Sequence, residues 1–182
     1  GKTTTAALIE SIAGAAGRST GVIGTIGTRY AGTIEPAIHT TPEAPDLQAL
    51  LARMRRAEVE VVAMEVSSHA LAQHRVDGTR FAAVAFTNLG HDHLDFHGGF
   101  DGLVEAFARF LATAPNRWCC ADDEVAARLA LAAEARTYGT AVAADCRLRD
   151  EIATAGKVRF SVDTPAGCFP DLAVPVGVKV AV

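Results

Sequence analysis

Two short apolar runs constrain the fold of this 182-residue chain more than any other feature of its sequence. Residues 59–64 and 81–86 are apolar almost without a break, and segments with helical spacing come after them at 68–74 and 100–111. Strands that are apolar on both faces are typical of parallel sheets covered by helices. The alternation of helices and strands therefore predicts an α/β fold with a mostly parallel sheet flanked by helices.

The rest of the chain adds elements around that sheet. Thr41 is expected to cap a helix that continues to residue 57, with Pro42 in its first turn. A helix over 3–16 and a strand over 22–24 are also expected, whereas turn-forming residues predict a loop over 29–41. Beyond Asn116 we expect short strands, the last three forming a small antiparallel extension, at 118–121, 136–138, 146–149, 158–162 and 169–174. Nothing marks a second domain, so residues 1–182 are expected to form one domain.

Composition excludes several classes of protein. The chain is 49% hydrophobic and 21% charged, which is typical of a folded domain and not of a disordered one. A net charge of −4 indicates no broad basic surface for nucleic acid, and no apolar run is long enough to cross a bilayer. The cysteines match no zinc spacing and are expected to be small buried side chains in a reducing compartment: Cys119, Cys120, Cys146 and Cys168.

The chain opens with GKTTT, directly before the first predicted helix. This is the second half of a P-loop, the element that binds triphosphates. Gly1 would let the backbone approach a phosphate closely, and Lys2 would place a positive charge on the β and γ phosphates. Thr3 would offer a hydroxyl to Mg²⁺, and Thr4 would reach another phosphate oxygen. The alternative interpretation of these residues is a capped helix start without a ligand.

Two polar segments come directly after the two apolar strands, where open α/β sheets place their ligands. Glu65 ends the first strand, and a carboxylate there is costly unless it is paired or bound to metal. The alternative is a local salt bridge beside a helix capped by Ser67 or Ser68. The second segment, TNLGHDHLDFHG over residues 87–98, holds three histidines and two aspartates. It indicates a metal site, with a polar loop that caps the next helix as the alternative.

Zinc is compatible with the composition of that second segment, but no pair of histidines lies four residues apart on a helix and no cysteine joins them. Mg²⁺ is the better candidate if a P-loop supplies a triphosphate beside it, although histidine is an unusual ligand for this ion. Together, the P-loop residues and the two polar segments predict metal-assisted phosphoryl transfer.

Longer motifs give a resemblance to a known family. GKTTT, TIGT, HTTPEAPDLQ, MEVSSHALAQHRVDGTRF and FTNLGHDHLDFHG occur in the order and spacing of the Mur ligases. Over residues 1–98 the chain resembles their MurE branch, which adds a diamino acid to UDP-N-acetylmuramoyl-L-alanyl-D-glutamate in peptidoglycan precursor synthesis. The resemblance implies a P-loop NTPase-like central domain that uses ATP and Mg²⁺ and ligates through an acyl phosphate.

The resemblance also implies a setting for this domain. Its partners would be a UDP-N-acetylmuramoyl peptide and an amino acid, without nucleic acid or membrane, in a monomeric enzyme of the bacterial cytoplasm. A UDP-binding amino-terminal domain and an amino-acid-binding carboxy-terminal domain are expected to lie outside residues 1–182. We therefore expect these residues by themselves to be inactive as a ligase.

The same resemblance implies roles for individual residues. The catalytic residues would be Lys2, Glu65 and His93. The metal ligands would be Thr3, Glu65 and His93. The residues that bind ATP would be Gly1, Lys2, Thr3, Thr4 and Asn88. The contacts to the UDP-muramoyl peptide would be Thr40, Thr41, Ser67, Gln73 and Arg75. The guanidinium fork of arginine suits the anionic groups of such a substrate.

The chain departs from the MurE pattern in its second half. Phe107 stands where MurE-type sequences have a lysine that is carbamylated to hold a second Mg²⁺, and His91 stands where an arginine is usual. From Phe100 onward, FDGLVEAFARFL, CADDEVA, ARTYG and ADCRLRD resemble the MurC branch, which adds L-alanine to UDP-N-acetylmuramate. A MurC-type ligase and a non-catalytic nucleotide-binding module are therefore the alternative functions.

Overall fold

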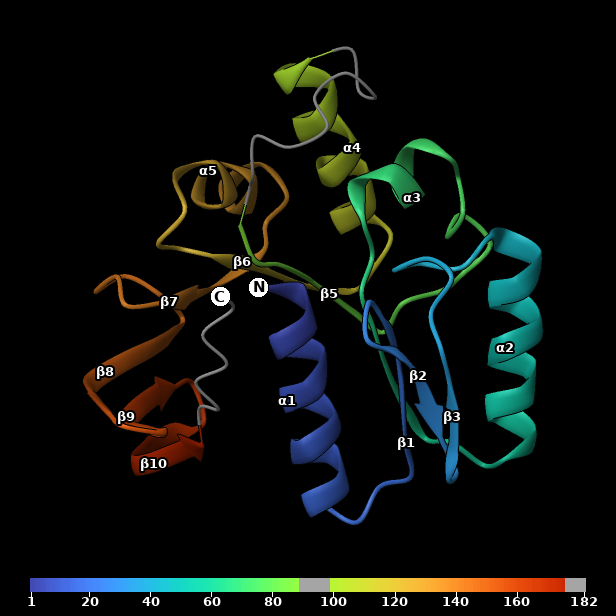
Figure 1. The fold of residues 1–182 in the computed structure, drawn as a ribbon. Helices are drawn as coiled ribbons and strands as arrows, with labels where there is room; N and C mark the ends of the chain where they lie inside the picture. Colours follow the sequence, from blue (N-terminus) through green and yellow to red (C-terminus); the bar gives the residue numbers. More distant parts are fainter. Residues whose placement is uncertain (89–98, 176–182) are drawn as a thin grey trace. The chain divides into compact units, whose positions relative to one another are not determined.

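The computed structural model describes residues 1–88 and 99–175. The chain divides into two compact units (Figure 1). The first unit comprises residues 1–81 and 90–113, and the second comprises 82–89 and 114–182. Each unit is built around its own sheet.

The first unit contains a four-stranded sheet in the order β3-β2-β1-β4. Its strands are β1 (Thr20–Gly24), β2 (Gly27–Tyr30), β3 (Thr33–Glu35) and β4 (Val61–Met64). Its helices are α1 (Lys2–Ala15), α2 (Ala44–Arg56), α3 (Ser68–Ala72) and α4 (Phe100–Ala112). β1 is parallel to β4 and antiparallel to β2, so the carboxyl ends of β1 and β4 lie at the same edge of the sheet.

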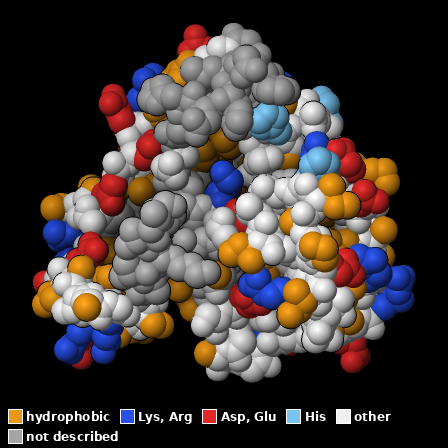
Figure 2. All heavy atoms as spheres, in the orientation of Figure 1, with side chains coloured by type: hydrophobic (Ala, Val, Ile, Leu, Met, Phe, Trp, Pro, Cys, Tyr) orange, Lys and Arg blue, Asp and Glu red, His pale blue; other side chains and the backbone are white. Residues whose placement is uncertain are grey.

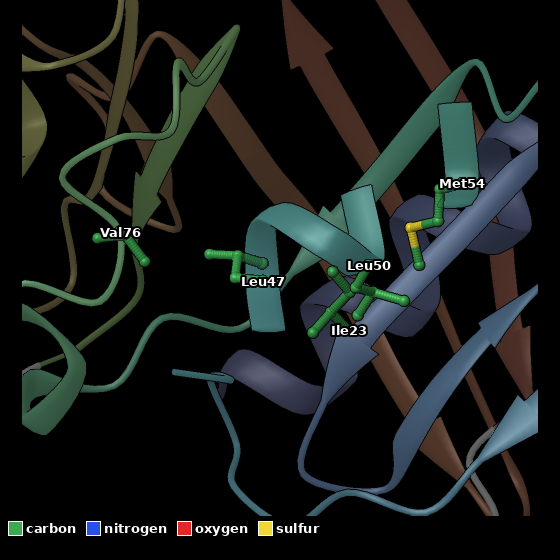
Figure 3. Close-up of a cluster of buried hydrophobic side chains, with 5 residues drawn as sticks. All are labelled: Ile23, Leu47, Leu50, Met54 and Val76. Atoms are coloured by element: carbon green, nitrogen blue, oxygen red, sulfur yellow. The ribbon is translucent and has the colours of Figure 1, made fainter. Parts of the chain in front are cut away.

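Strand β1 is covered on both faces because consecutive residues of a strand point to opposite sides. Val22 packs with Ala6 of α1 and Ala63 of β4. The next residue, Ile23, belongs to the opposite core with Leu47, Leu50, Met54 and Val76. Figure 3 shows Ile23 next to Leu50 of α2. These two cores fix α1 and the end of β1 against β4, which positions the candidate site at the carboxyl ends of these strands.

The second unit contains a six-stranded sheet in the order β10-β9-β8-β7-β6-β5. Its elements are β5 (Ala83–Phe86), β6 (Asn116–Cys120), α5 (Glu124–Ala132), β7 (Arg136–Gly139), β8 (Cys146–Thr154), β9 (Lys157–Thr164) and β10 (Gly167–Pro175). Strands β5 to β8 pair in parallel, and β8 to β10 pair antiparallel. The predicted α/β class and its antiparallel extension are therefore confirmed.

Two predicted elements differ from the structure, and one helix was not predicted. Residues 29–41 are not a continuous loop, because β2 and β3 extend the sheet from β1 as antiparallel strands. Thr41 does not cap α2, which begins at Ala44 after Glu43 and carries Pro45 in its first turn. Helix α5 was not predicted; Asp123 caps it by accepting a hydrogen bond of 2.8 Å from the backbone of Ala126.

The cysteine prediction is only partly correct. None of the four forms a disulfide, but Cys119 is the one that is fully buried, and Cys168 is exposed. Burial raises the pKa of the Cys119 thiol to about 11, so this group stays protonated at neutral pH. Cys120 and Cys146 are half-buried.

On the face shown in Figure 2, basic and acidic side chains of the described residues are interspersed. Within the described ranges, no helix combines the length and the apolar character that a bilayer crossing requires.

Candidate functional site

The site is built at the carboxyl ends of the two parallel strands of the first unit. Glu65 comes directly after β4 and is only 3% exposed. Its backbone N–H donates to the carbonyl oxygen of Ile23 at 2.9 Å, which ties the end of β4 to the end of β1. Helix α1 packs on both strands. The amino end of α1 and the ends of β1 and β4 therefore surround one buried carboxylate.

Three hydrogen bonds fix the Glu65 carboxylate. Thr3 Oγ1 donates to Oε2 at 2.8 Å. The backbone N–H of Thr25 donates to Oε1 at 2.9 Å, and its hydroxyl donates to Oε2 at 3.3 Å. Both oxygens thus have protein donors, as a buried carboxylate requires. The alternative interpretation placed Glu65 in a local salt bridge, whereas its partners are the hydroxyls of Thr3 and Thr25 and one backbone N–H. The helix cap expected beside it is present, because Ser67 caps α3 by accepting from the backbone N–H of Ala70.

Gly24 is part of this arrangement because a side chain at this position would overlap the Glu65 carboxylate. A Cβ atom at this position would lie 2.1 Å from Glu65 Oε1 and 2.8 Å from its Cδ. Real Cβ atoms essentially never make nonbonded contacts this short, so the missing side chain of Gly24 makes room for the carboxylate. The end of β1 is therefore shaped to accept Glu65.

The remaining P-loop residues lie at the start of α1. Gly1 is the N-cap residue, and Lys2 and Thr4 are exposed in the first turn. The hydroxyl of Thr5 donates to the Gly1 carbonyl at 3.2 Å. The backbone N–H groups in the first turn of a helix have no partner within it, and they can bind an anion such as a phosphate. The structure thus places Thr3 against Glu65, and Lys2, the residue before Thr3, is exposed.

Thr41, predicted to contact the substrate, is a buried part of the framework. It is 1% exposed, its hydroxyl donates to the Glu65 carbonyl at 2.9 Å, and it accepts from the backbone N–H of Ser67 at 3.1 Å. Thr40, its neighbour, lies with its hydroxyl 3.1 Å from the hydroxyl of Thr25. The two threonines therefore connect the predicted substrate side to the Glu65 carboxylate and backbone.

Arg75 already has protein partners. Its guanidinium donates to the Thr41 carbonyl at 2.9 Å and to Gln73 Oε1 at 2.8 Å, and it forms an ion pair of 2.7 Å with Glu43. Four of the five predicted substrate residues thus form one network: Thr41, Ser67, Gln73 and Arg75. To bind a substrate anion directly, Arg75 would have to replace one of these protein partners by the anion.

For two predicted site residues the structure gives no position relative to Glu65. His93, the third predicted metal ligand, lies outside the described residues. Asn88 belongs to the second unit, where Thr87 donates to its Oδ1 at 3.2 Å. In that unit the Tyr138 hydroxyl donates to the Phe86 carbonyl at the end of β5, at 3.2 Å. Burial raises the pKa of Tyr138 to about 12, so its proton stays available for this bond.

The residues present fit Mg²⁺ better than zinc. Thr3 and Glu65 offer oxygen atoms, which are the ligands that Mg²⁺ prefers. In the part of the chain that the structure describes, three or more His, Cys, Asp or Glu side chains do not gather into a cluster that could hold a metal. Because the Thr3 hydroxyl uses its proton on Glu65, its lone pairs remain available to a cation.

Sequence reasoning missed Thr25 and Gly24 as site residues. Gly24 is the last residue of β1, and Thr25 opens the TIGT segment directly after it. The available signal was their position at the carboxyl end of a strand, which is also the position of Glu65.

A helix start with a P-loop ending, set against a buried carboxylate at the carboxyl edge of parallel strands, is the arrangement of a phosphate-binding α/β domain. The chain belongs to the family of the Mur ligase middle domain, whose model matches residues 1–175.

Relatives with known names support this membership. The UDP-N-acetylmuramoyl-L-alanyl-D-glutamate–2,6-diaminopimelate ligase of Corynebacterium glutamicum is 43% identical over 191 residues, covering 100% of this chain and 37% of that ligase. The ligase of the same name from Geobacter sulfurreducens is 41% identical over 180 residues, covering 92% of this chain and 34% of its own length. A solved structure of such a ligase matches with a TM-score of 0.81 at 27% identity, covering 95% of this chain and 36% of that one. The chain thus spans about a third of the length of these relatives.

Proposed function

We propose that this chain is the ATP-binding middle domain of a ligase that adds a diamino acid to UDP-N-acetylmuramoyl-L-alanyl-D-glutamate. The observation that carries the proposal is the hydrogen bond between Thr3 and Glu65, because it joins the phosphate-binding helix start to a buried carboxylate. Relatives named for this reaction, at 43% and 41% identity, support the choice of substrate. The bacterial cytoplasm, the monomeric state and the absence of nucleic-acid and membrane partners remain predictions.

The proposed chemistry assigns a task to each part of the site. Lys2 and the first backbone N–H groups of α1 hold the phosphates of ATP and neutralise their charge. Thr3 and Glu65, with His93 as the predicted third ligand, would hold Mg²⁺, which would supply stabilisation of the charge that develops during phosphoryl transfer. The substrate carboxylate would attack the γ-phosphorus of ATP, whose bond to the bridging oxygen would break, so that an acyl phosphate forms and ADP leaves. The incoming amine would then attack the acyl carbon, lose a proton and expel inorganic phosphate to form the amide.

On the substrate side, Thr40, Ser67, Gln73 and Arg75 are proposed to contact the UDP-muramoyl peptide. Thr41 is proposed to act as a positioning residue, since its side chain is buried and holds the Glu65 backbone. Asn88 is proposed to lie at the nucleotide. The amino acid to be added is proposed to be bound by sequence outside residues 1–182, since this chain covers 37% of the length of the Corynebacterium ligase.

The test is a product assay on the ligase expressed with the flanking sequence that its relatives carry. With ATP, Mg²⁺ and UDP-N-acetylmuramoyl-L-alanyl-D-glutamate, we expect phosphate release and a product whose mass has increased by one diamino acid. Residues 1–182 alone are expected to give neither. Absence of phosphate release with both diaminopimelate and lysine would reject the proposal.

A MurC-type ligase is the second candidate, and Phe107 is the residue that favours it. Phe107 lies in α4 and cannot be carbamylated, so it cannot supply the second metal ligand expected of MurE-type sequences. This candidate predicts turnover with UDP-N-acetylmuramate and L-alanine instead. The Corynebacterium relative covers the whole chain, including α4, which favours the first candidate. A binding module without catalysis would bind ATP in the same assay and release no phosphate.

Lys2→Ala is expected to weaken ATP binding by about 1.5–3 kcal/mol, the range for a hydrogen bond to a charged group. The physical reason is the loss of the ammonium at the helix start, where the phosphates are proposed to lie. Isothermal calorimetry with Mg·ATP on the intact ligase measures this change. Lys157→Ala removes a similar charge at the start of β9 and should leave the affinity as it was. An unchanged affinity in Lys2→Ala would remove Lys2 from the nucleotide site.

A further inference from the structure

The Thr25 hydroxyl lies between two residues for which the resemblance implies different ligands. It donates to Glu65 Oε2, on the predicted metal side, at 3.3 Å. It also lies 3.1 Å from the hydroxyl of Thr40, on the predicted substrate side. Thr25 thus joins two groups that are 25 residues apart along the chain.

The direction of these hydrogen bonds can be settled by proton counting. A carboxylate can only accept, whereas a threonine hydroxyl has one proton to donate and lone pairs to accept with. Since the Thr25 proton goes to Glu65, Thr25 accepts its second bond from Thr40. The hydrogen bonds therefore run in one direction: Thr40 donates to Thr25, and Thr25 donates to Glu65, which stabilises the carboxylate.

Thr25 forms hydrogen bonds to both oxygens of the Glu65 carboxylate. Its backbone N–H binds Oε1 while its hydroxyl binds Oε2, and Gly24 leaves the space in which Oε1 lies. Two contacts from one residue fix the rotation of the carboxylate as well as its position. The Thr25 side chain is itself exposed, so it does not contribute to packing of the core.

We propose that Thr25 is a positioning residue that orients Glu65 for Mg²⁺ and couples it to substrate bound at Thr40. A substrate that engages Thr40 would order the Thr40–Thr25–Glu65 chain and thereby favour binding of the metal and its nucleotide. Coupling between two ligands is reciprocal, so the nucleotide would favour the substrate by the same factor. The coupling rests on the proposed function, whereas the orientation of Glu65 does not.

The test compares Thr25→Val with Thr25→Ser in the intact ligase. Valine keeps the shape and the backbone N–H but removes the hydroxyl, and serine restores the hydroxyl. Thr33→Val in β3 makes the same change elsewhere in the sheet and serves as the control. Calorimetry with ADP over a series of Mg²⁺ concentrations, with and without UDP-N-acetylmuramoyl-L-alanyl-D-glutamate, gives both the metal requirement and the coupling.

For Thr25→Val we expect the Mg²⁺ concentration that supports half-maximal ADP binding to rise about ten-fold, as for a lost hydrogen bond to a charged group. The gain in ADP affinity caused by the substrate should disappear. Thr25→Ser and Thr33→Val should both behave as the wild type. A Thr25→Val protein with an unchanged Mg²⁺ requirement would overturn the positioning role, and one with unchanged coupling would overturn the link to Thr40.

A failure of the proposed function would give a different binding result from a failure of the role of Thr25. If the wild type bound Mg·ADP but not the UDP-muramoyl peptide, the substrate assignment and the coupling would fail together. The Mg²⁺ requirement of the Thr25→Val protein would still decide whether Thr25 orients Glu65.

Discussion

Glu65→Gln is expected to lower kcat/KM by about a hundred- to a thousand-fold, which is the scale seen when a group that stabilises transition-state charge is removed. The substitution keeps the volume of the side chain but removes the negative charge that is proposed to hold Mg²⁺. It also replaces one acceptor oxygen by an NH₂ donor. The loss should appear in kcat and in the Mg²⁺ requirement together.

The fold should tolerate this change because of the particular donors around Glu65. The Thr25 backbone N–H can only donate, so the glutamine oxygen will take that side. The NH₂ group will then face the hydroxyls of Thr3 and Thr25, which can rotate to accept. We therefore expect a cooperative thermal transition close to that of the wild type, measured by circular dichroism.

Glu60→Gln is the matched control, since Glu60 lies just before β4 as Glu65 lies just after it. Glu60 is exposed and pairs with Arg18 at 2.7 Å, away from the carboxyl edge of the sheet. Its variant should retain wild-type turnover. If Glu65→Gln also kept wild-type kcat/KM and Mg²⁺ requirement, Glu65 would have no part in the chemistry.

The position of Glu65 could be predicted from sequence because a general rule fixes it. Residues that end parallel strands lie at one edge of the sheet, so a P-loop threonine and the acid that ends the apolar strand 59–64 were expected to be near each other. The bond between Thr3 and Glu65 agrees with that expectation. The expectation came from topology and needed no knowledge of side-chain conformations.

The contacts within the site could not be predicted in the same way. Thr41 precedes a proline, which locally indicates a helix cap, but its hydroxyl binds the Glu65 carbonyl instead. A long-range bond replaced the local one because Thr41 is buried, where each polar group needs a partner. Strands β2 and β3 were missed for a related reason. Their glycines and turn residues suggest a loop, whereas pairing with β1 makes them strands.

Gly24→Ala is the sharpest test of the shape of the site. The added methyl group would lie 2.1 Å from Glu65 Oε1, so the carboxylate or the end of β1 must move. Glu65 is 3% exposed and held by three hydrogen bonds, so a shift of its side chain would break some of these bonds. A displacement of about 1 Å can reduce turnover about a hundred-fold, and crowding of this kind typically costs about 1–3 kcal/mol of stability.

Gly14→Ala is the control for that experiment, because nothing lies within 4 Å of the Cβ that alanine would add in α1. Alanine favours a helix over glycine by about 1 kcal/mol, so this variant should be as stable as the wild type or more stable, with full activity. Urea unfolding and the product assay, applied to both variants, separate stability from catalysis. The decisive result is Gly24→Ala with activity reduced far beyond its loss of stability. Wild-type turnover in that variant would show that the close packing of Gly24 against Glu65 does not matter for the reaction.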